Sequence, residues 1–595
     1  MLKYLKKYWL FALLAPLCMI GEVSMDLLQP RLMSTIIDEG VLGVSNNNVG
    51  DLNLILTTGL QMILTVLIGG TFGVLCGVFT NISSQNFGND MRKDAFRHIM
   101  SLSFQQTDQF STGSLITRIT NDITQVQNMV AQCFRGFVRN IMFFIGGIVC
   151  MLSLDLSFGV IVACAFPFLL ICVVFFITRI TPNFSILQKK LDRVNSVMQE
   201  NVTGSRVVKA YVREEYEKNR FGNANQDLIS TQLRILTLFS FMGPIMNIVL
   251  NISVVAVLYV GSVRVQAGGV TPGNVMAAIT YLSQILNSVM MFAMIFQTVS
   301  RGMASFARIR EVLECEPAIT DAICADNEIP HQGKVEFKNV SFAYPNGSGE
   351  SVLSNINLTV HPGETLGILG STGSGKSSLV NLIPRFYDVT EGEILVDGVN
   401  VKDYKLSDLR KRIAIALQKS ELFSTSIREN MRWGRMDASD EELETAARTA
   451  QASEFIHSKQ EGFDTMVAEK GMSLSGGQKQ RLSISRAVLK KADILIFDDS
   501  TSALDLKTES RLYEALRTHH KNTTKIIIAQ RIASVKGANR IAVIDNGHIV
   551  ACDSHENLLK TCEIYQDIYQ SQLKSSADAE ITYESFSSTK SAEMR

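Results

Sequence analysis

Apolar residues gather in the first half of the chain, in runs long enough to cross a membrane. A membrane-spanning helix needs about 20 mostly apolar residues, and runs such as "FGVIVACAFPFLLICVVFFITRI" reach that length. Soluble domains do not place several runs of this kind in one segment. The pattern therefore predicts six transmembrane helices, near residues 9–35, 54–80, 134–154, 157–180, 236–262 and 273–299.

Lysine and arginine residues indicate how these helices are oriented. The connection over 181–235 is rich in both, whereas the short connection over 152–157 contains neither. Positively charged connections stay on the cytoplasmic side of a membrane. We therefore expect the connections over 81–133 and 181–235, and both termini, in the cytosol. Both connections keep helical periodicity, so they should form long helices that project from the cytoplasmic membrane into the cytosol.

The pattern changes after residue 301, where a polar linker leads into alternating apolar and polar residues at "KVEFKNVSFAY". Such alternation is typical of β-strands. We expect a transmembrane domain over 1–320, a linker over 321–334 and an α/β domain over 335–574. The last segment, 575–595, is poor in apolar residues, so we expect a disordered tail.

Composition agrees with a membrane protein of several domains. The 595 residues are 46% hydrophobic and 19% charged. The net charge is +0, which gives no electrostatic reason to expect a nucleic-acid partner. The 10 cysteines follow no metal-ligand spacing and mostly fall in apolar runs, so we expect reduced thiols.

The α/β half contains a phosphate-binding loop. "ETLGILGSTGSGKSSLV" predicts a strand, a glycine-rich loop and a helix, which is the setting that such a loop needs. Its backbone N–H groups can surround phosphates, Lys376 can reach the outer phosphates, and Ser377 can ligate Mg²⁺. A second strand, "ADILIFDD", ends in Asp498, the expected Mg²⁺ carboxylate. We therefore expect ATP and Mg²⁺ as cofactors, with ATP held by Gly370, Ser371, Thr372, Gly373, Ser374, Gly375, Lys376, Ser377 and Ser378.

Further motifs make the half from 335 to 565 resemble an ATP-binding cassette (ABC) domain. "LSGGQ" matches the family signature, "IALQKSELF" its glutamine loop, "VSFAYPNG" its adenine-stacking aromatic residue and "SALD" its dimer-contact loop. With the apolar half in front, the whole chain resembles a bacterial ABC exporter half-transporter. The resemblance implies a type I exporter fold, which is an α-helical transmembrane domain followed by an α/β nucleotide-binding domain. It assigns roles to Tyr344 (adenine), Gln418 (Mg²⁺ and phosphate), Leu474, Ser475, Gly476, Gly477 and Gln478 (signature), and 502–505 (dimer contact).

The resemblance also implies a partner. In this family two cassettes meet head to tail, so each ATP lies between the phosphate loop of one chain and the signature of the other. We therefore expect a second ABC half-transporter, surrounding membrane lipid, and a hydrophobic or amphipathic small molecule as substrate. ATP held between two chains favours their closed arrangement through its higher affinity for that state.

The residue after Asp498 departs from the family's pattern. Hydrolytic relatives have a glutamate there, which positions or deprotonates the attacking water, whereas this chain has Asp499. Losing one methylene withdraws the carboxylate, and a displacement of about 1 Å can cost about a hundredfold in rate. The alternative is a conservative exchange that water or small backbone shifts absorb.

The family's switch histidine is replaced as well. "KIIIAQRIASV" resembles the switch segment, with Gln530 at the histidine position. An amide forms hydrogen bonds but does not take up a proton near neutral pH. Because both changes fall in one composite site, we expect this site to bind ATP and to hydrolyse it poorly. The pattern resembles the degenerate-site subunit of a heterodimeric multidrug exporter, whose signature serves the partner's active site.

Two stretches of the inner connections, 110–123 and 205–221, resemble the family's coupling elements, which dock into the cassettes. Without that resemblance they would be interpreted as solvated, charged helices. In the first span, Glu22 and Asp26 share a helix face, and intramembrane carboxylates usually face a cavity or a partner. Either they recognise a cation or they pair with Arg31.

The last span carries an adaptable apolar stripe with a few hydrogen-bonding groups, which suits a binding wall, although helix packing explains it equally well. Its members are Gln284, Asn287, Met290, Met291 and Met294. The sequence thus predicts ATP-dependent export of amphipathic or drug-like small molecules by one half of a heterodimer. Lipid or peptide export is an alternative with the same architecture. A non-transporting ATP-gated channel or sensor assembly is an alternative of another class, and the apolar half disfavours a soluble ATPase acting on DNA.

Overall fold

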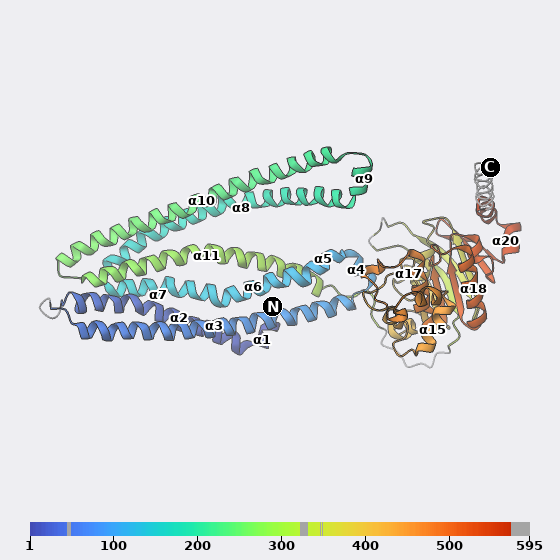
Figure 1. Cartoon of the computed structure of the whole chain (residues 1–595), viewed down its shortest axis with the longest axis horizontal. Helices are drawn as coiled ribbons and strands as arrows, with labels where there is room; N and C mark the ends of the chain where they lie inside the picture. Colours follow the sequence, from blue (N-terminus) through green and yellow to red (C-terminus); the bar gives the residue numbers. More distant parts are fainter. Residues whose placement is uncertain (45–48, 322–330, 346, 348, 573–595) are drawn as a thin grey trace. The chain divides into compact units, whose positions relative to one another are not determined.

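The computed structural model describes residues 1–44, 49–321, 331–345, 347 and 349–572 (Figure 1). Its contacts divide the chain into two compact units. The first unit joins Met1–Met100 to Thr112–Glu314, and the second joins Ser101–Ser111 to the residues from Cys315 onward. Residues 322–330 of the expected linker and the expected tail over 575–595 lie outside the described residues.

Long helices build the first unit. They are α1 (Leu2–Lys6), α2 (Trp9–Thr35), α3 (Leu52–Ser101), α5 (Thr112–Thr117), α6 (Ile123–Gln132), α7 (Val138–Leu154), α8 (Leu156–Thr203), α9 (Ser205–Ala210), α10 (Glu214–Gln266) and α11 (Pro272–Leu313). Six helical segments of the described residues are long and apolar enough to cross a membrane, which confirms the six predicted spans. Both α3 and α8 continue well beyond their apolar runs, so the predicted long helices in the two inner connections are confirmed as well.

A buried carboxylate fixes the end of α2 to the start of α11. Asp38 lies in the turn that continues α2 and is 7% exposed. It accepts hydrogen bonds from the Gly273 backbone N–H at 2.7 Å and from the Thr271 hydroxyl at 2.6 Å. The first N–H groups of a helix have no partner inside it, so a carboxylate from elsewhere stabilises them.

The two carboxylates in α2 pair with an arginine of α7, so the alternative that they pair with Arg31 is wrong. Glu22 Oε1 accepts a hydrogen bond from Arg139 Nη1 at 2.8 Å, and Asp26 Oδ2 lies 3.6 Å from Arg139 Nη2. Residues five apart on a helix point about 140° away from each other, so Arg31 does not share the face of Asp26. A chain of one positive and two negative groups therefore joins α2 to α7.

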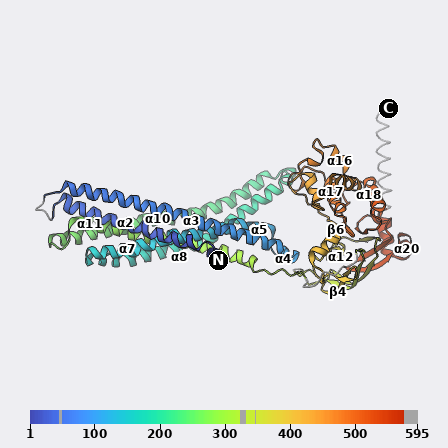
Figure 2. The same ribbon diagram turned by 90° about the horizontal axis from the view of Figure 1, so that it is seen from below.

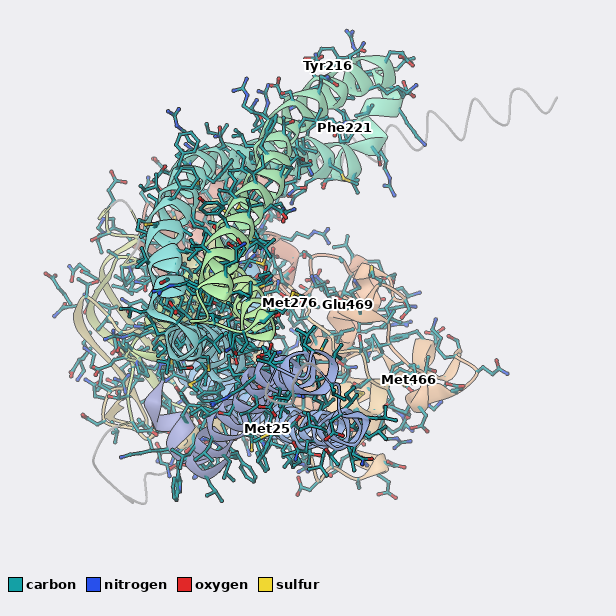
Figure 3. The ribbon with its side chains drawn as sticks, turned by 90° about the vertical axis from the view of Figure 1, so that its left-hand side faces the viewer. Met25, Tyr216, Phe221, Met276, Met466 and Glu469 are labelled. Carbon is teal, nitrogen blue, oxygen red and sulfur yellow. The ribbon has the colours of Figure 1, made fainter. Side chains whose placement is uncertain are left out.

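Helices α8 and α10 run side by side as an arm and are joined through α9 (Figures 1 and 2). Figure 3 labels Tyr216 and Phe221 close to the end of this arm. Apolar side chains there are open to solvent, with Tyr211 74% and Val212 81% exposed, and a groove of about 420 Å³ runs past Met198 and Phe221. We call residues 198–221 the arm tip. Exposed apolar surface of this kind marks an interaction site.

Two β-sheets form the centre of the second unit. One has six strands in the order β10-β9-β3-β8-β7-β6, parallel except for β10, and the other has four antiparallel strands in the order β2-β1-β4-β5. The strands are β1 (Val335–Phe342), β2 (Leu353–Val360), β3 (Thr365–Gly370), β4 (Glu391–Val396), β5 (Val399–Asn400), β6 (Ile413–Ala416), β7 (Ile494–Asp498), β8 (Thr524–Ile528), β9 (Arg540–Asp545) and β10 (His548–Asp553). This architecture confirms the predicted α/β domain.

Helices surround the parallel sheet. They include α12 (Lys376–Leu382), α13 (Leu406–Arg412), α14 (Ile427–Arg432), α15 (Asp440–Thr449), α16 (Ser453–His457), α17 (Gly476–Leu489), α18 (Leu506–His519), α19 (Ile532–Val535) and α20 (His555–Thr561). Every residue of β3, β7 and β8 is buried. Parallel strands covered by helices on both faces are mostly apolar, as the run "ILIF" of β7 and the run "III" of β8 are.

A short helix from the first half of the chain belongs to this second unit. It is α4 (Phe104–Gln109), whose Phe104 ring packs against Phe386 with 4.6 Å between ring centroids. Asp108 of the same helix accepts a hydrogen bond from the Tyr387 hydroxyl at 2.7 Å. These contacts lie just before the stretch 110–123 in which a coupling element was expected, so the sequence pattern missed Phe104 and Asp108.

Candidate functional site

The order of strands in the larger sheet brings the functional segments together. β3, β8 and β7 are neighbours and run parallel, so their carboxyl ends meet at one edge. β3 leads into the phosphate-binding loop, β7 ends in Asp498, and β8 leads into Gln530. Ligands of open α/β sheets bind at this edge.

A cavity of about 250 Å³ opens at this edge. The predicted residues that line it come from the loop, the glutamine loop, the end of β7 and the switch segment: Thr372, Gly373, Gly375, Lys376, Ser377, Ser378, Gln418, Asp499 and Gln530. The signature residues, Leu474 to Gln478, do not line it. A larger cavity of about 520 Å³ lies between α18 and α19 and contains none of the predicted site residues.

Glycines let the phosphate-binding loop turn tightly. Gly375 has a φ of +97°, and a Cβ atom there would lie 2.9 Å from the Val352 carbonyl oxygen. A Cβ atom on Gly370 would lie only 2.1 Å from the carbonyl oxygen of Ile544. Only glycine fits either position without displacing the backbone.

Lys376 bends back over the loop. Its ammonium donates hydrogen bonds to the carbonyl oxygens of Gly370 at 2.9 Å and Ser371 at 2.6 Å. Burial lowers the pKa of Lys376, against the opposing attraction of Asp499 and Asp498. The buried ammonium therefore lies where negatively charged phosphate oxygens would stabilise its positive charge.

The side-chain oxygens of Ser377 and Asp498 lie next to each other. The Ser377 hydroxyl donates a hydrogen bond to Asp498 Oδ1 at 2.8 Å, and Asp498 is 4% exposed. Burial raises the pKa of Asp498 and the neighbouring Asp499 raises it further, while the bond from Ser377 opposes the change. Magnesium prefers oxygen ligands and would offset the cost of this buried negative charge. The Ser377 and Asp498 oxygens thus fit the expected Mg²⁺.

Two glutamine amides converge on Asp499. Its Oδ2 accepts a hydrogen bond from Gln530 Nε2 at 3.1 Å and lies 3.4 Å from Gln418 Nε2. The backbone of Asp499 has a φ of +45°, which aspartate tolerates better than most residues. The two positions that depart from the family's pattern, 499 and 530, are therefore in direct contact.

Tyr344 lies beside the loop in a cluster of aromatic rings. Its hydroxyl lies 3.0 Å from the Ser378 hydroxyl, and its ring meets Phe342 and Tyr387 edge to face, with centroids 4.8 and 5.2 Å apart. These edge contacts are a common aromatic packing geometry and fix the plane of the ring.

Replacing Tyr344 with alanine should weaken ATP binding by about five- to a hundredfold, because stacking of a base on an aromatic ring contributes about 1–3 kcal/mol. Tyr344→Trp keeps a large aromatic ring, so the ATP affinity of this variant should stay close to that of the parent protein. Tyr344→Phe removes only the hydroxyl at Ser378 and serves as the control. Equilibrium titration with fluorescent ATP measures all three, and equal losses for alanine and tryptophan would contradict stacking.

The signature begins helix α17. The Ser475 hydroxyl accepts a hydrogen bond from the Gln478 N–H at 3.3 Å, and Gln478 Oε1 accepts one from the Ser475 N–H at 3.0 Å. This reciprocal capping box leaves the proton of the Ser475 hydroxyl available for another acceptor. The first glycine N–H groups of α17 have no partner within the helix, so this end of α17 suits an anion.

Gln480 links the signature helix to the dimer-contact loop, and the sequence pattern did not point to it. Its Nε2 donates to the Ser502 hydroxyl at 3.1 Å, and its Oε1 accepts from the Ala503 N–H at 2.9 Å. The side chain is 6% exposed. The sequence feature that could have identified Gln480 is its position two residues after the "LSGGQ" motif.

Comparison with known proteins finds transporter relatives that match nearly the whole chain. Residues 12–289 match the ABC transporter transmembrane region family, and residues 353–502 match the ABC transporter family. A Bacillus subtilis protein named an uncharacterized ABC transporter ATP-binding protein is 37% identical over 571 residues, which is 96% of this chain and 98% of the relative. An ATP-dependent lipid A-core flippase of Syntrophus aciditrophicus is 33% identical, over 87% of this chain and 85% of that protein.

A solved structure is also similar. It is that of a bacterial Atm1-family ABC exporter with ATP bound, with a TM-score of 0.77 and 26% sequence identity. The match covers 96% of this chain and 98% of the exporter chain.

Proposed function

Because the chain belongs to the ABC transporter family, as an exporter half-transporter, we propose that it exports amphipathic or drug-like small molecules as one half of a heterodimer. In this proposal its own ATP site retains nucleotide, and hydrolysis takes place mainly at the site completed by its signature and the partner's phosphate loop. The nucleotide-binding domain and both termini lie in the cytosol.

The contact between Gln530 and Asp499 is the observation that carries the proposal. One carboxylate oxygen of Asp499, Oδ2, already accepts an amide N–H from Gln530, so this oxygen is less available to an attacking water. The amide at 530 has no proton-accepting nitrogen, so it does not relay a proton onward. Two adjacent changes that each impair base catalysis support a site specialised for holding ATP.

Binding groups remain in place beside these changes. The loop glycines, Lys376, Ser377 and Asp498 have the geometry that phosphates and a hard cation require. Ser377 and Asp498 would hold Mg²⁺, which would supply positive charge against the phosphates. The chain's own groups orient the nucleotide, Lys376 through its ammonium and Tyr344 through its ring.

Two surfaces support a second half-transporter as partner. The free hydroxyl proton of Ser475 and the start of α17 are suited to a phosphate that this chain's own cavity does not bring to them. The arm tip exposes Val207, Tyr211 and Val212, which a docking partner would cover.

Lipid export is the second candidate, because two relatives are named lipid A-core flippases, with 33% and 36% identity. A cavity of about 290 Å³ between α7 and α11 has a mostly apolar surface with a few polar groups, as an amphipathic substrate of either class requires. Phe143 and Met291 line it together with Arg139, Asn140, Gln284 and Asn287. A phospholipid analogue is therefore included in the test.

The proposal is tested by reconstituting the chain with its partner in vesicles and measuring ATP-dependent uptake into inside-out vesicles. We expect uptake of an amphipathic dye and dye-stimulated ATPase activity. Transport of a fluorescent lipid without the dye would favour lipid export. ATP-dependent ion conductance, or nucleotide binding without any transport, would replace the proposal with a channel or a sensor assembly.

A further inference from the structure

The end of the described chain holds the switch segment through a single side chain. Gln572 Nε2 donates a hydrogen bond to the Gln530 carbonyl oxygen at 2.8 Å, and Gln572 Oε1 accepts one from the Ile532 N–H at 2.9 Å. Only one orientation of the amide makes both bonds, so donor and acceptor are unambiguous. We call this pair of bonds the Gln572 clamp.

The clamp satisfies groups that the switch segment leaves open. α19 has four residues, and Arg531, which precedes it, gives no side-chain cap. The N–H of Ile532 is one of the unpaired donors at a helix start, and Gln572 supplies its acceptor. Because the clamp joins the carbonyl at 530 to the N–H at 532, it restricts the backbone dihedrals between them.

Gln572 is itself held firmly. It lies in a helix over residues 563–572, in which Tyr565 is 0% exposed and its hydroxyl lies 2.6 Å from His555 Nδ1. Gln566 of the same helix donates to the Leu559 carbonyl oxygen at 2.8 Å. The helix that carries Gln572 is thus anchored to α20 and to the core through Tyr565 and Gln566.

The clamp continues into the ATP site. The backbone it grips carries the Gln530 side chain, which donates to Asp499 at 3.1 Å. Gln530 also lines the cavity with Lys376 and Ser377. A change of backbone dihedrals at 530–532 would swing this amide away from Asp499 and from the part of the cavity lined by Lys376 and Ser377.

We infer that Gln572 is a positioning residue for the switch segment, and that it sets how strongly this site distinguishes ATP from ADP. The inference rests on the proposed function, in which this site holds ATP, and on the place of Gln530 beside Lys376 and Ser377 in the same cavity, where its amide N–H can reach a terminal phosphate. ADP lacks the γ-phosphate, so a displaced Gln530 should weaken ATP binding and leave ADP binding nearly unchanged. A general loss of folding would weaken both nucleotides.

The test uses the full-length chain with its partner, purified together, and the variant Gln572→Leu, which removes both bonds. Gln570→Leu is the matched control, because Gln570 lies in the same helix and is exposed. Hydrogen exchange of the peptide over 529–535 should become several-fold faster in Gln572→Leu alone. ATP affinity should fall about three- to tenfold, as for the loss of one hydrogen bond, with ADP affinity within about twofold.

A double-mutant cycle with Gln530→Ala separates positioning from a merely structural role. If Gln572 acts through Gln530, Gln572→Leu should cause no further loss of ATP affinity once Gln530→Ala is present. Additive losses, or unchanged exchange at 529–535, would overturn the inference. Loss of nucleotide discrimination in Gln530→Ala but not in Gln572→Leu would overturn this inference alone. Unchanged discrimination in both variants would also overturn it, whereas the proposed function is tested separately by ATP-dependent uptake.

Discussion

Replacing Lys376 with alanine should abolish most nucleotide binding at this chain's site. The change removes an ammonium that donates to the carbonyl oxygens of Gly370 and Ser371 and that phosphates would attract. Hydrogen bonds involving a charged group contribute about 1.5–3 kcal/mol, and more than one would be lost. We expect a fall in ATP affinity of at least about a hundredfold, measured as nucleotide retained by the trapped, purified complex.

Lys402→Ala is the control for this substitution, because Lys402 is an exposed lysine of the same domain that does not line the ATP cavity. Its nucleotide occupancy should match that of the parent. The pKa of Lys376 is lowered by burial, and phosphate would raise it again, so binding couples to proton uptake. Affinity should therefore decline as the pH rises through the lowered pKa of Lys376. Unchanged occupancy in Lys376→Ala would exclude its contact with phosphate.

The fold was largely predictable because its signals are local and repeated. Length and hydropathy alone distinguish a membrane span from a strand, and the six spans follow from that criterion. The buried strands β7 and β8 are equally clear, since uninterrupted apolar runs such as "ILIF" and "III" are typical of parallel sheets. Strand order is not local, so only the structure places β8 between β3 and β7.

The site was predictable where motif residues contact one another, and less so where distant segments meet. Sequence spacing places Lys376 and Ser377 in one loop, and the structure adds that Gln530 donates directly to Asp499. The pairing of Glu22 with Arg139 joins residues 117 positions apart, so the sequence offered only the nearer Arg31 as a pairing alternative, and that alternative is wrong. Gln572 belongs to no sequence motif. Its contacts are to backbone groups of residues 530 and 532, and backbone groups leave no signal in the sequence.

Ser475 and Asp499 offer the strongest test of the heterodimer, because in the proposed arrangement they serve different sites. Ser475→Ala should severely reduce steady-state ATPase of the complex, since its hydroxyl would contact the phosphate at the partner's hydrolytic site. The same change removes the cap of α17, which alone costs about 1 kcal/mol. Ser475→Gly keeps most of the capping preference but lacks the hydroxyl, so equal losses in both variants assign the effect to the phosphate contact.

Asp499→Asn should lower steady-state ATPase only modestly, because the carboxylate removed already accepts an amide from Gln530 and contributes little as a base. Replacing the glutamate at the matching position of the partner with glutamine should instead cost about a hundred- to ten-thousandfold, the usual contribution of general-base catalysis. The chain purified alone should hydrolyse ATP slowly even if it self-associates, since both sites would then carry Asp499 and Gln530. Phosphate release from the lone chain, from the complex and from each single variant measures these differences. Rapid hydrolysis by the lone chain that Asp499→Asn abolishes would instead establish a homodimeric exporter with an aspartate base.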